Sequence, residues 1–175
     1  MTTLLRSIDL GISSIFFYLG GMLPHWFVIF FATYLIWIMG IFVIVFLLIN
    51  SKKRMRVFAN VIAASSLAYV INFLIGYFFF RSRPFASLGI EALIGTSHLN
   101  KSFPSDHTAV AFSIAMAVFL KNKKIGAILL VLALFVSIGR MLSRVHYLSD
   151  VIGGIAVAVF SAYAMKRLIK EGNVC

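Results

Sequence analysis

The 175-residue sequence has few acidic residues and a single cysteine. Because Cys175 is the only thiol, the chain can form neither an internal disulfide framework nor a cysteine-based metal site. Charged residues make up 12% of the chain, against about 25% in an average soluble domain. Hydrophobic residues account for 62%, so the composition excludes an ordinary soluble domain and indicates an integral membrane protein.

The few charges are mostly positive, with 16 Lys and Arg against 5 Asp and Glu. A nucleic-acid-binding protein would gather its basic groups on one soluble face. Here they lie at the ends of apolar runs, which is typical of the positive-inside bias of membrane proteins. We therefore expect no nucleic-acid partner, and expect the bilayer, with its anionic headgroups, to be the partner of these charges.

Five apolar segments predict membrane spans at residues 26–49, 57–80, 105–120, 125–141 and 151–165. At about 1.5 Å per residue, the first two exceed the roughly 30 Å hydrocarbon core. The other three are shorter, as expected if polar site residues are sheltered at their outer ends. Residues 1–23 contain Asp9 and predict an interfacial helix or a sixth span. The fold class is thus all-α, a polytopic transmembrane helix bundle forming one domain over residues 1–175, with one long loop at 81–104.

Three polar islands interrupt the apolar sequence, and they consist of Arg83-Pro84, Ser102 to His107, and Arg140 with His146 and Asp150. Ionisable residues at the edges of membrane spans are costly and usually functional. Two arginines can hold an anion, one histidine can attack phosphorus, and a second can protonate the leaving group. A carboxylate can orient the attacking ring. The islands predict phosphoryl transfer without a metal or other cofactor.

The basic residues also predict the orientation of the chain. Ten lie on one side of a five-span chain, namely Lys52, Lys53, Arg54, Arg56, Lys121, Lys123, Lys124, Lys166, Arg167 and Lys170. Five lie on the other side, namely Arg81, Arg83, Lys101, Arg140 and Arg144. Cytoplasmic loops carry the excess of Lys and Arg, so the ten-residue side is expected to be cytoplasmic. All three islands then share the extracytoplasmic side of the cell (inner) membrane.

Two local patterns have both a catalytic and a structural interpretation. Ser105 is a good helix N-cap, and the amides that follow it would form an anion site; alternatively it is a plain cap, with His107 merely exposed. His146 and Asp150 are four residues apart, so on one helix face the carboxylate could fix the imidazole tautomer. The alternative is a structural pair that closes a helix end. Arg83 and Arg140 could likewise be snorkelling side chains.

Together these residues resemble the type 2 phosphatidic acid phosphatase family, also called lipid phosphate phosphatases, which shares its core with vanadium haloperoxidases. The family pattern is Lys-x6-Arg-Pro, then Pro-Ser-Gly-His, then Ser-Arg-x5-His-x3-Asp. The corresponding residues here are Arg83-Pro84, Pro104-Ser105-Asp106-His107 and Gly139-Arg140-x5-His146-x3-Asp150. The resemblance covers residues 72–154, roughly half the chain.

The sequence departs from the family pattern at three positions. Gly76 stands where the family has its lysine, so one phosphate-binding cation is missing. Arg81 could replace that cation or could be a loop charge. Asp106 stands in place of a glycine, which resembles the bacterial undecaprenyl-diphosphatase branch, and Gly139 stands in place of a serine.

Other polar residues near the islands have weaker patterns. Arg144 lies one turn from Arg140 and could contact phosphate or lipid, and Pro104 is a candidate through its place in the second motif. Glu91 and Lys101 are expected to lie on the loop surface.

The resemblance implies a role for each motif residue. His146 would attack phosphorus and form a phosphohistidine, with Asp150 orienting its ring. His107 would protonate the leaving oxygen and then activate water. The oxygens of the phosphoryl group would be held by Arg83, Arg140, Ser105 and the amides near Asp106.

We therefore expect a membrane lipid phosphatase that removes a terminal phosphate from a lipid phosphate or diphosphate. Undecaprenyl diphosphate, phosphatidylglycerol phosphate and the 1-phosphate of lipid A are the candidate substrates, and Ser-Phe-Pro-Ser-Asp-His favours the first. An alternative of another class is a lipid-phosphate transporter or flippase without hydrolysis. A third is a haloperoxidase-like enzyme that holds vanadate. The sequence does not determine the oligomeric state.

Overall fold

The protein was analysed as a computed structural model, which describes residues 3–49, 54–96 and 101–171. All regular structure in these ranges is helical, so the all-α prediction is confirmed for the described residues. The elements are α1 (Thr3–Met22), α2 (His25–Ile29), the π-helical turn η1 (Phe30–Tyr34), α3 (Leu35–Ile49), α4 (Arg54–Phe78), α5 (Pro84–Leu88), α6 (Asp106–Phe119), α7 (Lys123–Leu142) and α8 (Leu148–Glu171).

Four helical segments are long and apolar enough to cross a membrane, namely His25–Ile49, Met55–Phe78, Lys123–Leu142 and Leu148–Ile169. They correspond to four of the five predicted spans. A helix satisfies its own backbone hydrogen bonds, which the bilayer core requires of any spanning segment. The remaining predicted span, at residues 105–120, corresponds to α6, whose 14 residues cover only about 21 Å at about 1.5 Å per residue. The chain is a multi-pass helical membrane protein.

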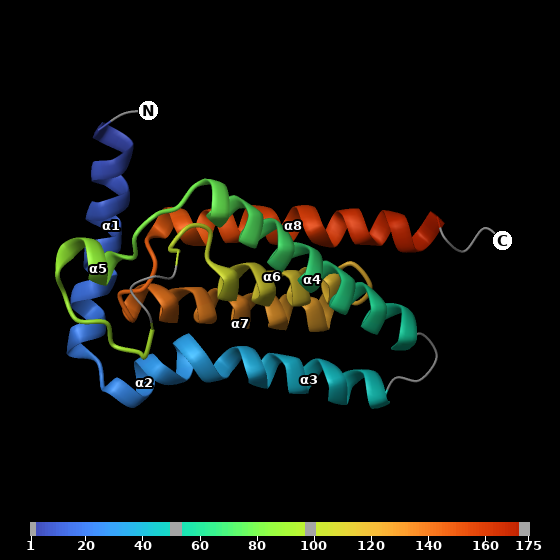
Figure 1. Cartoon of the computed structure of the whole chain (residues 1–175). Helices are drawn as coiled ribbons and strands as arrows, with labels where there is room; N and C mark the ends of the chain where they lie inside the picture. The colour runs from blue at the N-terminus through green and yellow to red at the C-terminus, as the bar shows by residue number, and fades with distance from the viewer. Residues whose placement is uncertain (1–2, 50–53, 97–100, 172–175) are drawn as a thin grey trace.

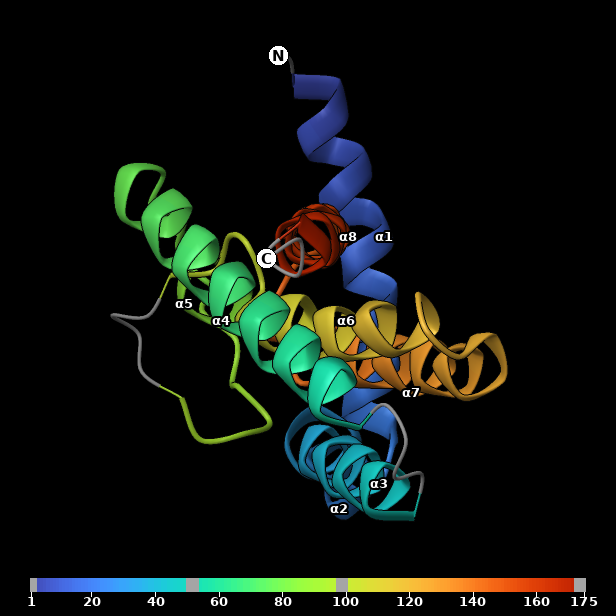
Figure 2. The same cartoon turned by 90° about the vertical axis from the view of Figure 1, so that its right-hand side faces the viewer.

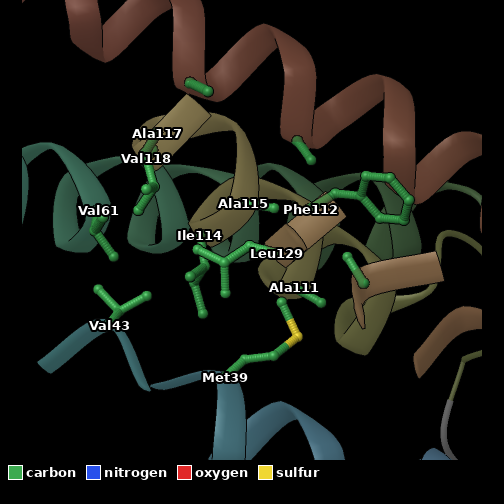
Figure 3. Close-up of a cluster of buried hydrophobic side chains, with 14 of the residues drawn as sticks. Met39, Val43, Val61, Ala111, Phe112, Ile114, Ala115, Ala117, Val118 and Leu129 are labelled. Carbon is green, nitrogen blue, oxygen red and sulfur yellow. The ribbon is translucent and has the colours of Figure 1, made fainter. Parts of the chain in front are cut away.

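The short helix α6 lies inside the bundle and packs against α4, α7 and α8 (Figure 1). Its inner faces carry small residues such as Ala111 and Ala115, which are fully buried and let the neighbouring helices approach closely. Figure 3 shows Met39 of α3 and Leu129 of α7 packing around these alanines. Because protein covers α6, it does not have to match the thickness of the lipid.

The polar islands gather at one end of the bundle. There α4 and α7 end and α6 and α8 begin, with α5 close by, while the turn from α6 to α7 and the end of α8 lie at the opposite end (Figure 1). This arrangement confirms that the three islands share one end. Of the basic residues assigned to the cytoplasmic side, Lys52 and Lys53 lie outside the described residues.

Helix α1 crosses the site end of the bundle and does not run alongside the other helices (Figures 1 and 2). Its buried residues are Ser13, Phe17 and Gly20. A Cβ atom at Gly20 would overlap the carbonyl oxygen of Leu142, so only glycine allows this close packing of α1 on the end of α7. The rest of α1 is mostly exposed.

The predicted loop at 81–104 contains one short helix. Pro84 occupies the first turn of α5, where its missing N–H costs nothing, and Arg83 precedes it in an extended conformation. Gly89 ends the helix with a left-handed φ of 64°. The result is that Arg83 is held at a fixed junction between loop and helix.

Candidate active site

The second motif docks directly on the start of α8. Ser105 caps α6, as predicted, with its Oγ 3.5 Å from the Thr108 amide. A Cβ atom at Gly154 would lie 2.8 Å from the Ser105 carbonyl oxygen, and one at Gly153 would lie 2.7 Å from the Phe103 ring. The two glycines therefore let α8 pack closely against the start of α6.

His146 lies in the connector between α7 and α8, and Asp150 lies in the first turn of α8. The expected common helix face is thus replaced by a turn, but the two side chains still meet, with Nδ1 3.5 Å from Oδ2. This is long for a hydrogen bond. Oδ2 also accepts from the Tyr147 amide at 2.8 Å and from Ser102 Oγ at 2.5 Å. The carboxylate is therefore fixed on the Nδ1 side of the ring.

The other oxygen of Asp150 is bound by Arg81. Arg81 Nη1 lies 2.9 Å from Asp150 Oδ1, and its Nη2 lies 2.8 Å from Asp9 Oδ2 of α1. The guanidinium also covers the Tyr147 ring at 3.9 Å from the centroid. Arg81 lines a separate cavity, which Asp9 and Tyr147 also line, and it binds the carboxylate oxygen of Asp150 that does not face His146.

A cavity of about 570 Å³ opens where the islands meet. One wall is polar and consists of Arg83, Lys101, Asp106, His107 and His146. The other wall comes from α4 and its end, with Tyr69, Phe73, Gly76, Tyr77 and Phe80. A polar pocket beside an apolar wall that also faces outward suits a phosphorylated headgroup attached to a lipid chain. Ser105, Arg140 and Asp150 are buried and are not among the residues that line this cavity.

Burial also sets the protonation of the connector histidine. It lowers the pKa of His146 to about 4, with the positive charges of Arg140 and Arg83 acting in the same direction and the hydrogen-bonding contact with Asp150 opposing them. His146 is therefore neutral near pH 7 and keeps a free lone pair. Burial lowers the pKa of Arg83 as well, against the charges of Asp106 and Asp150.

Two arginines lie close to the histidines. Arg83 is only 6% exposed, with Nη1 donating to Thr96 Oγ1 at 2.5 Å and Nε to the Lys101 carbonyl at 3.2 Å. Arg140 is 4% exposed, and its Nη1 donates to the carbonyl of Ala32 in η1 at 3.2 Å.

The environment of Arg140 leaves its charge poorly compensated. Among the described residues no carboxylate lies within ion-pair distance of the guanidinium, and its Nε has no hydrogen-bond partner. A buried cation is costly unless an anion compensates it. The neighbouring Gly139, which departs from the family serine, lets α7 meet η1, because a Cβ atom there would lie 2.6 Å from the Ala32 nitrogen.

The expectation that Lys101 lies on the loop surface is wrong. Its side chain is only 15% exposed, and Nζ lies 2.8 Å from Asp106 Oδ1 and 3.1 Å from the Pro104 carbonyl oxygen. Asn72 of α4 donates to the same carboxylate oxygen at 3.1 Å. Sequence reasoning missed this cluster. The available signal was that a lysine is absent at Gly76 while an unexpected carboxylate is present at Asp106.

The remaining candidates lie outside the cavity. Arg144 adopts a left-handed φ of 65° and donates to the carbonyl oxygens of Phe17 and Glu91, each at 3.2 Å, so it joins α1 to the long loop. Pro104 is buried, and its carbonyl accepts from Lys101. Glu91 is exposed on the loop, as expected.

Known proteins are similar to this chain in both sequence and fold. The chain is 34% identical over 135 residues to the bacitracin transport permease protein BcrC of Bacillus licheniformis, which covers 77% of this chain and 66% of that protein. It is 34% identical over 119 residues to undecaprenyl-diphosphatase BcrC of Bacillus subtilis (strain 168), covering 67% and 60%. The matches thus span less than two thirds of these relatives' own length.

Two solved structures have a similar fold at lower sequence identity. LpxE of Aquifex aeolicus superposes with a TM-score of 0.68 and 24% identity, over 88% of this chain and 93% of that one. A phosphatidylglycerolphosphate phosphatase from Bacillus subtilis has a TM-score of 0.64 and 20% identity, over 97% and 88%. The PAP2 superfamily model matches residues 54–173, which include all three islands. The chain belongs to the PAP2 superfamily.

Proposed function

We propose that this protein is a membrane lipid phosphatase that removes a terminal phosphate from a lipid phosphate or diphosphate. The observation that carries the proposal is that His107, His146 and Arg83 line one cavity beside an apolar wall of α4. Membership of the PAP2 superfamily and similarity to a relative named undecaprenyl-diphosphatase support it.

The first chemical step belongs to His146. Its Nδ1 side faces Asp150, which leaves Nε2 as the atom that attacks phosphorus. As the N–P bond forms, the bond from phosphorus to the lipid-side oxygen breaks, and His107 donates its proton to that oxygen. The product is a phosphohistidine and a lipid with one phosphate fewer.

The second step regenerates the enzyme. His107, now neutral, takes a proton from a water molecule, and the resulting hydroxide attacks the phosphohistidine. The N–P bond breaks, phosphate leaves, and His107 holds the proton for the next cycle. Arg83 and Arg140 supply fixed positive charge for the oxygens of the transferring phosphoryl group, with Ser105 and the amides near Asp106 beside them. These steps use no metal ion.

Undecaprenyl diphosphate is our preferred substrate. The α4 wall of the cavity contains Tyr69, Phe73 and Tyr77, which are each more than half exposed and would lie against a long lipid chain. Phosphatidylglycerol phosphate and lipid A 1-phosphate remain the alternatives. Phosphate release from the three lipids, measured side by side, tests the preference; equal kcat/KM values for all three would contradict it.

A second candidate function is transport of a lipid phosphate without hydrolysis, which one relative's transport permease name favours. Purified wild-type protein and His146→Ala separate the two. Hydrolysis predicts phosphate release by the wild-type protein, loss of release in His146→Ala, and retained lipid binding. Lipid binding without phosphate release by the wild-type protein would contradict the phosphatase.

We further propose five crossings, with α6 as a short span sheltered by the bundle, α1 in the interface, and the cavity on the extracytoplasmic side. The support is the excess of basic residues at the opposite end and the transverse course of α1. The test uses Glu91→Cys and Lys121→Cys in a Cys175→Ser background. A membrane-impermeant thiol reagent applied to intact cells should label the first and not the second; the reverse would contradict the orientation.

A further inference from the structure

We infer that Lys101 is a phosphate-binding residue, held in the cavity by a notch at Gly76 and by the carboxylate of Asp106. The inference rests on the proposed phosphatase function. It also explains together two of the positions at which the chain departs from its family pattern, because a lysine is absent at 76 and an acidic residue is present at 106.

The notch is defined by the absence of a side chain on α4. A Cβ atom at Gly76 would overlap Lys101 Cδ and would lie 2.5 Å from its Cε. The aliphatic stem of Lys101 therefore fills the volume that any residue other than glycine would need at position 76. Burying this stem while its charged end meets polar groups is how lysine is commonly accommodated beside apolar surface. The ammonium group thereby enters the cavity from the loop side.

Asp106 fixes the ammonium group at this place. Its Oδ1 accepts from Lys101 Nζ at 2.8 Å and from Asn72 Nδ2 at 3.1 Å, and Pro104 O accepts from Lys101 Nζ at 3.1 Å. An ammonium group has three N–H donors, so these two acceptors leave one N–H for a ligand oxygen. Arg83, His107 and His146 line the same cavity. A phosphate bound there has Lys101 as a second cationic neighbour that lines the cavity, beside Arg83.

The pairing also removes an electrostatic conflict. The carboxylate of Asp106 lines a cavity that has to accept an anion, and alone it would repel phosphate oxygens. Lys101 compensates that negative charge and still offers a donor. The two residues should therefore be coupled: once Lys101 is removed, replacing Asp106 by the family's glycine should restore part of the binding.

Moving the ammonium group from the loop to α4 tests the inference. Lys101→Met removes the charge and keeps the stem, and we expect kcat/KM for undecaprenyl diphosphate to fall at least tenfold, the loss expected for a charge-assisted hydrogen bond. The inhibition constant for orthovanadate, a phosphate analogue, should rise by a similar factor. In Gly76→Lys with Lys101→Gly, the ammonium group returns from α4, and both values should recover to within about threefold of wild type.

Three further variants serve as controls. Gly76→Lys alone should be less active than the double variant, because both stems compete for one volume. The double variant Lys101→Met with Asp106→Gly should be inhibited by vanadate at a lower inhibition constant than Lys101→Met alone. Lys121→Met removes an exposed lysine at the opposite end and should match wild type. Unfolding temperatures are measured for every variant in the full-length protein.

The inference fails if Lys101→Met keeps kcat/KM and vanadate inhibition within twofold of wild type. It also fails if the folded double variant stays at the level of Lys101→Met, since Lys101 then acts only by closing the loop. Failure of the proposed function is distinct, because the wild-type protein would then release no phosphate or would release it without His146.

Discussion

The backbone N–H of Ser105 donates to the backbone carbonyl of Asp150 at 3.1 Å, which joins the start of α6 to the first turn of α8. This bond connects two islands that are 45 residues apart in the sequence. Together with the close approach of Gly154 to Ser105, it fixes the helix that carries His107 against the start of α8, next to the turn that carries His146. Small changes at this junction should therefore affect both histidines together.

The first prediction concerns Gly154, which forms this junction. In Gly154→Ala the new methyl group would lie 2.8 Å from Ser105 O and 3.1 Å from Thr108 Cβ, so α6 has to move. We expect a destabilisation of about 1–3 kcal/mol and a fall in kcat/KM of at least about tenfold. Phosphate release and thermal unfolding measure the two effects. Gly40→Ala is the matched control, because nothing lies within 4 Å of a Cβ atom there; equal behaviour of the two variants would count against the junction.

The second prediction concerns α1 as a cap for α8. Asp9 Oδ1 accepts from the Ser149 amide, and Ser13 Oγ accepts from the Leu148 amide, each at 2.9 Å. These amides have no partner within their own helix, so Ser13→Ala should cost about 1 kcal/mol of stability. Asp9→Ala should cost more, since it removes both the cap of the Ser149 amide and the ion pair with Arg81. The control Ser14→Ala, whose hydroxyl is exposed and bonds only to the Gly11 carbonyl of its own helix, should unfold within about 0.5 kcal/mol of wild type.

The third prediction concerns the pH dependence of the reaction. The pKa of His146 is lowered from 6.5 to about 4 by burial, then by Arg140 and Arg83, against the opposing contact with Asp150. His107 also lines the cavity beside His146. His146 stays neutral above about pH 4, so the acid limb of kcat/KM assigned to the nucleophile should lie near pH 4. A nucleophile limb near pH 6.5 would contradict this environment.

The same shift makes a prediction about stability. Between about pH 4 and pH 6.5 the unfolded chain binds a proton on His146 that the folded protein does not bind. The free energy of unfolding should therefore rise with pH through this window because of His146. His146→Gln should flatten that part of the profile. An unchanged slope in the variant would mean that other groups cause it.

The fourth prediction separates binding from stability at Arg140. The guanidinium is buried without an ion-pair partner in the described part of the chain, so Arg140→Met relieves an uncompensated charge. We expect an unfolding temperature equal to or above that of wild type, with kcat/KM lower by about 10²–10³-fold. Arg144→Met should show the opposite pattern, because Arg144 holds the Phe17 and Glu91 carbonyls outside the cavity. A variant of Arg140 that loses stability but keeps vanadate inhibition would contradict this assignment.

Local patterns predicted the parts of the fold that local physics controls. Long uncharged runs predicted the four helices that are long and apolar enough to cross a membrane, because a helix is the way such a run satisfies its backbone in lipid. Ser105 predicted the start of α6 because its side chain can accept from the amide three residues later. The helix predicted from 151 begins earlier, at Leu148, because Asp9 and Ser13 of α1 cap that end. That cap depends on a contact across more than half of the chain.

The cations show most clearly what the sequence could not predict. Arg81 was the candidate to replace the lysine missing at Gly76, but its charge is held by Asp9 and Asp150 in a different cavity. Lys101 was expected on the surface, but its stem lies in the notch of α4. Both outcomes depend on the path of the loop past α4 and on where α1 crosses the bundle.

The sequence alone determined which reactive groups the chain carries and which segments are apolar enough to cross a membrane, since composition and short-range spacing are enough for both. The tertiary structure decided that Lys101 lines the cavity with the histidines and that Arg81 instead binds the carboxylate of Asp150. A partly buried ionised side chain is stable where it meets an opposite charge and where the neighbouring residues leave room for it. At this end of the bundle both are supplied by residues that are distant in the sequence.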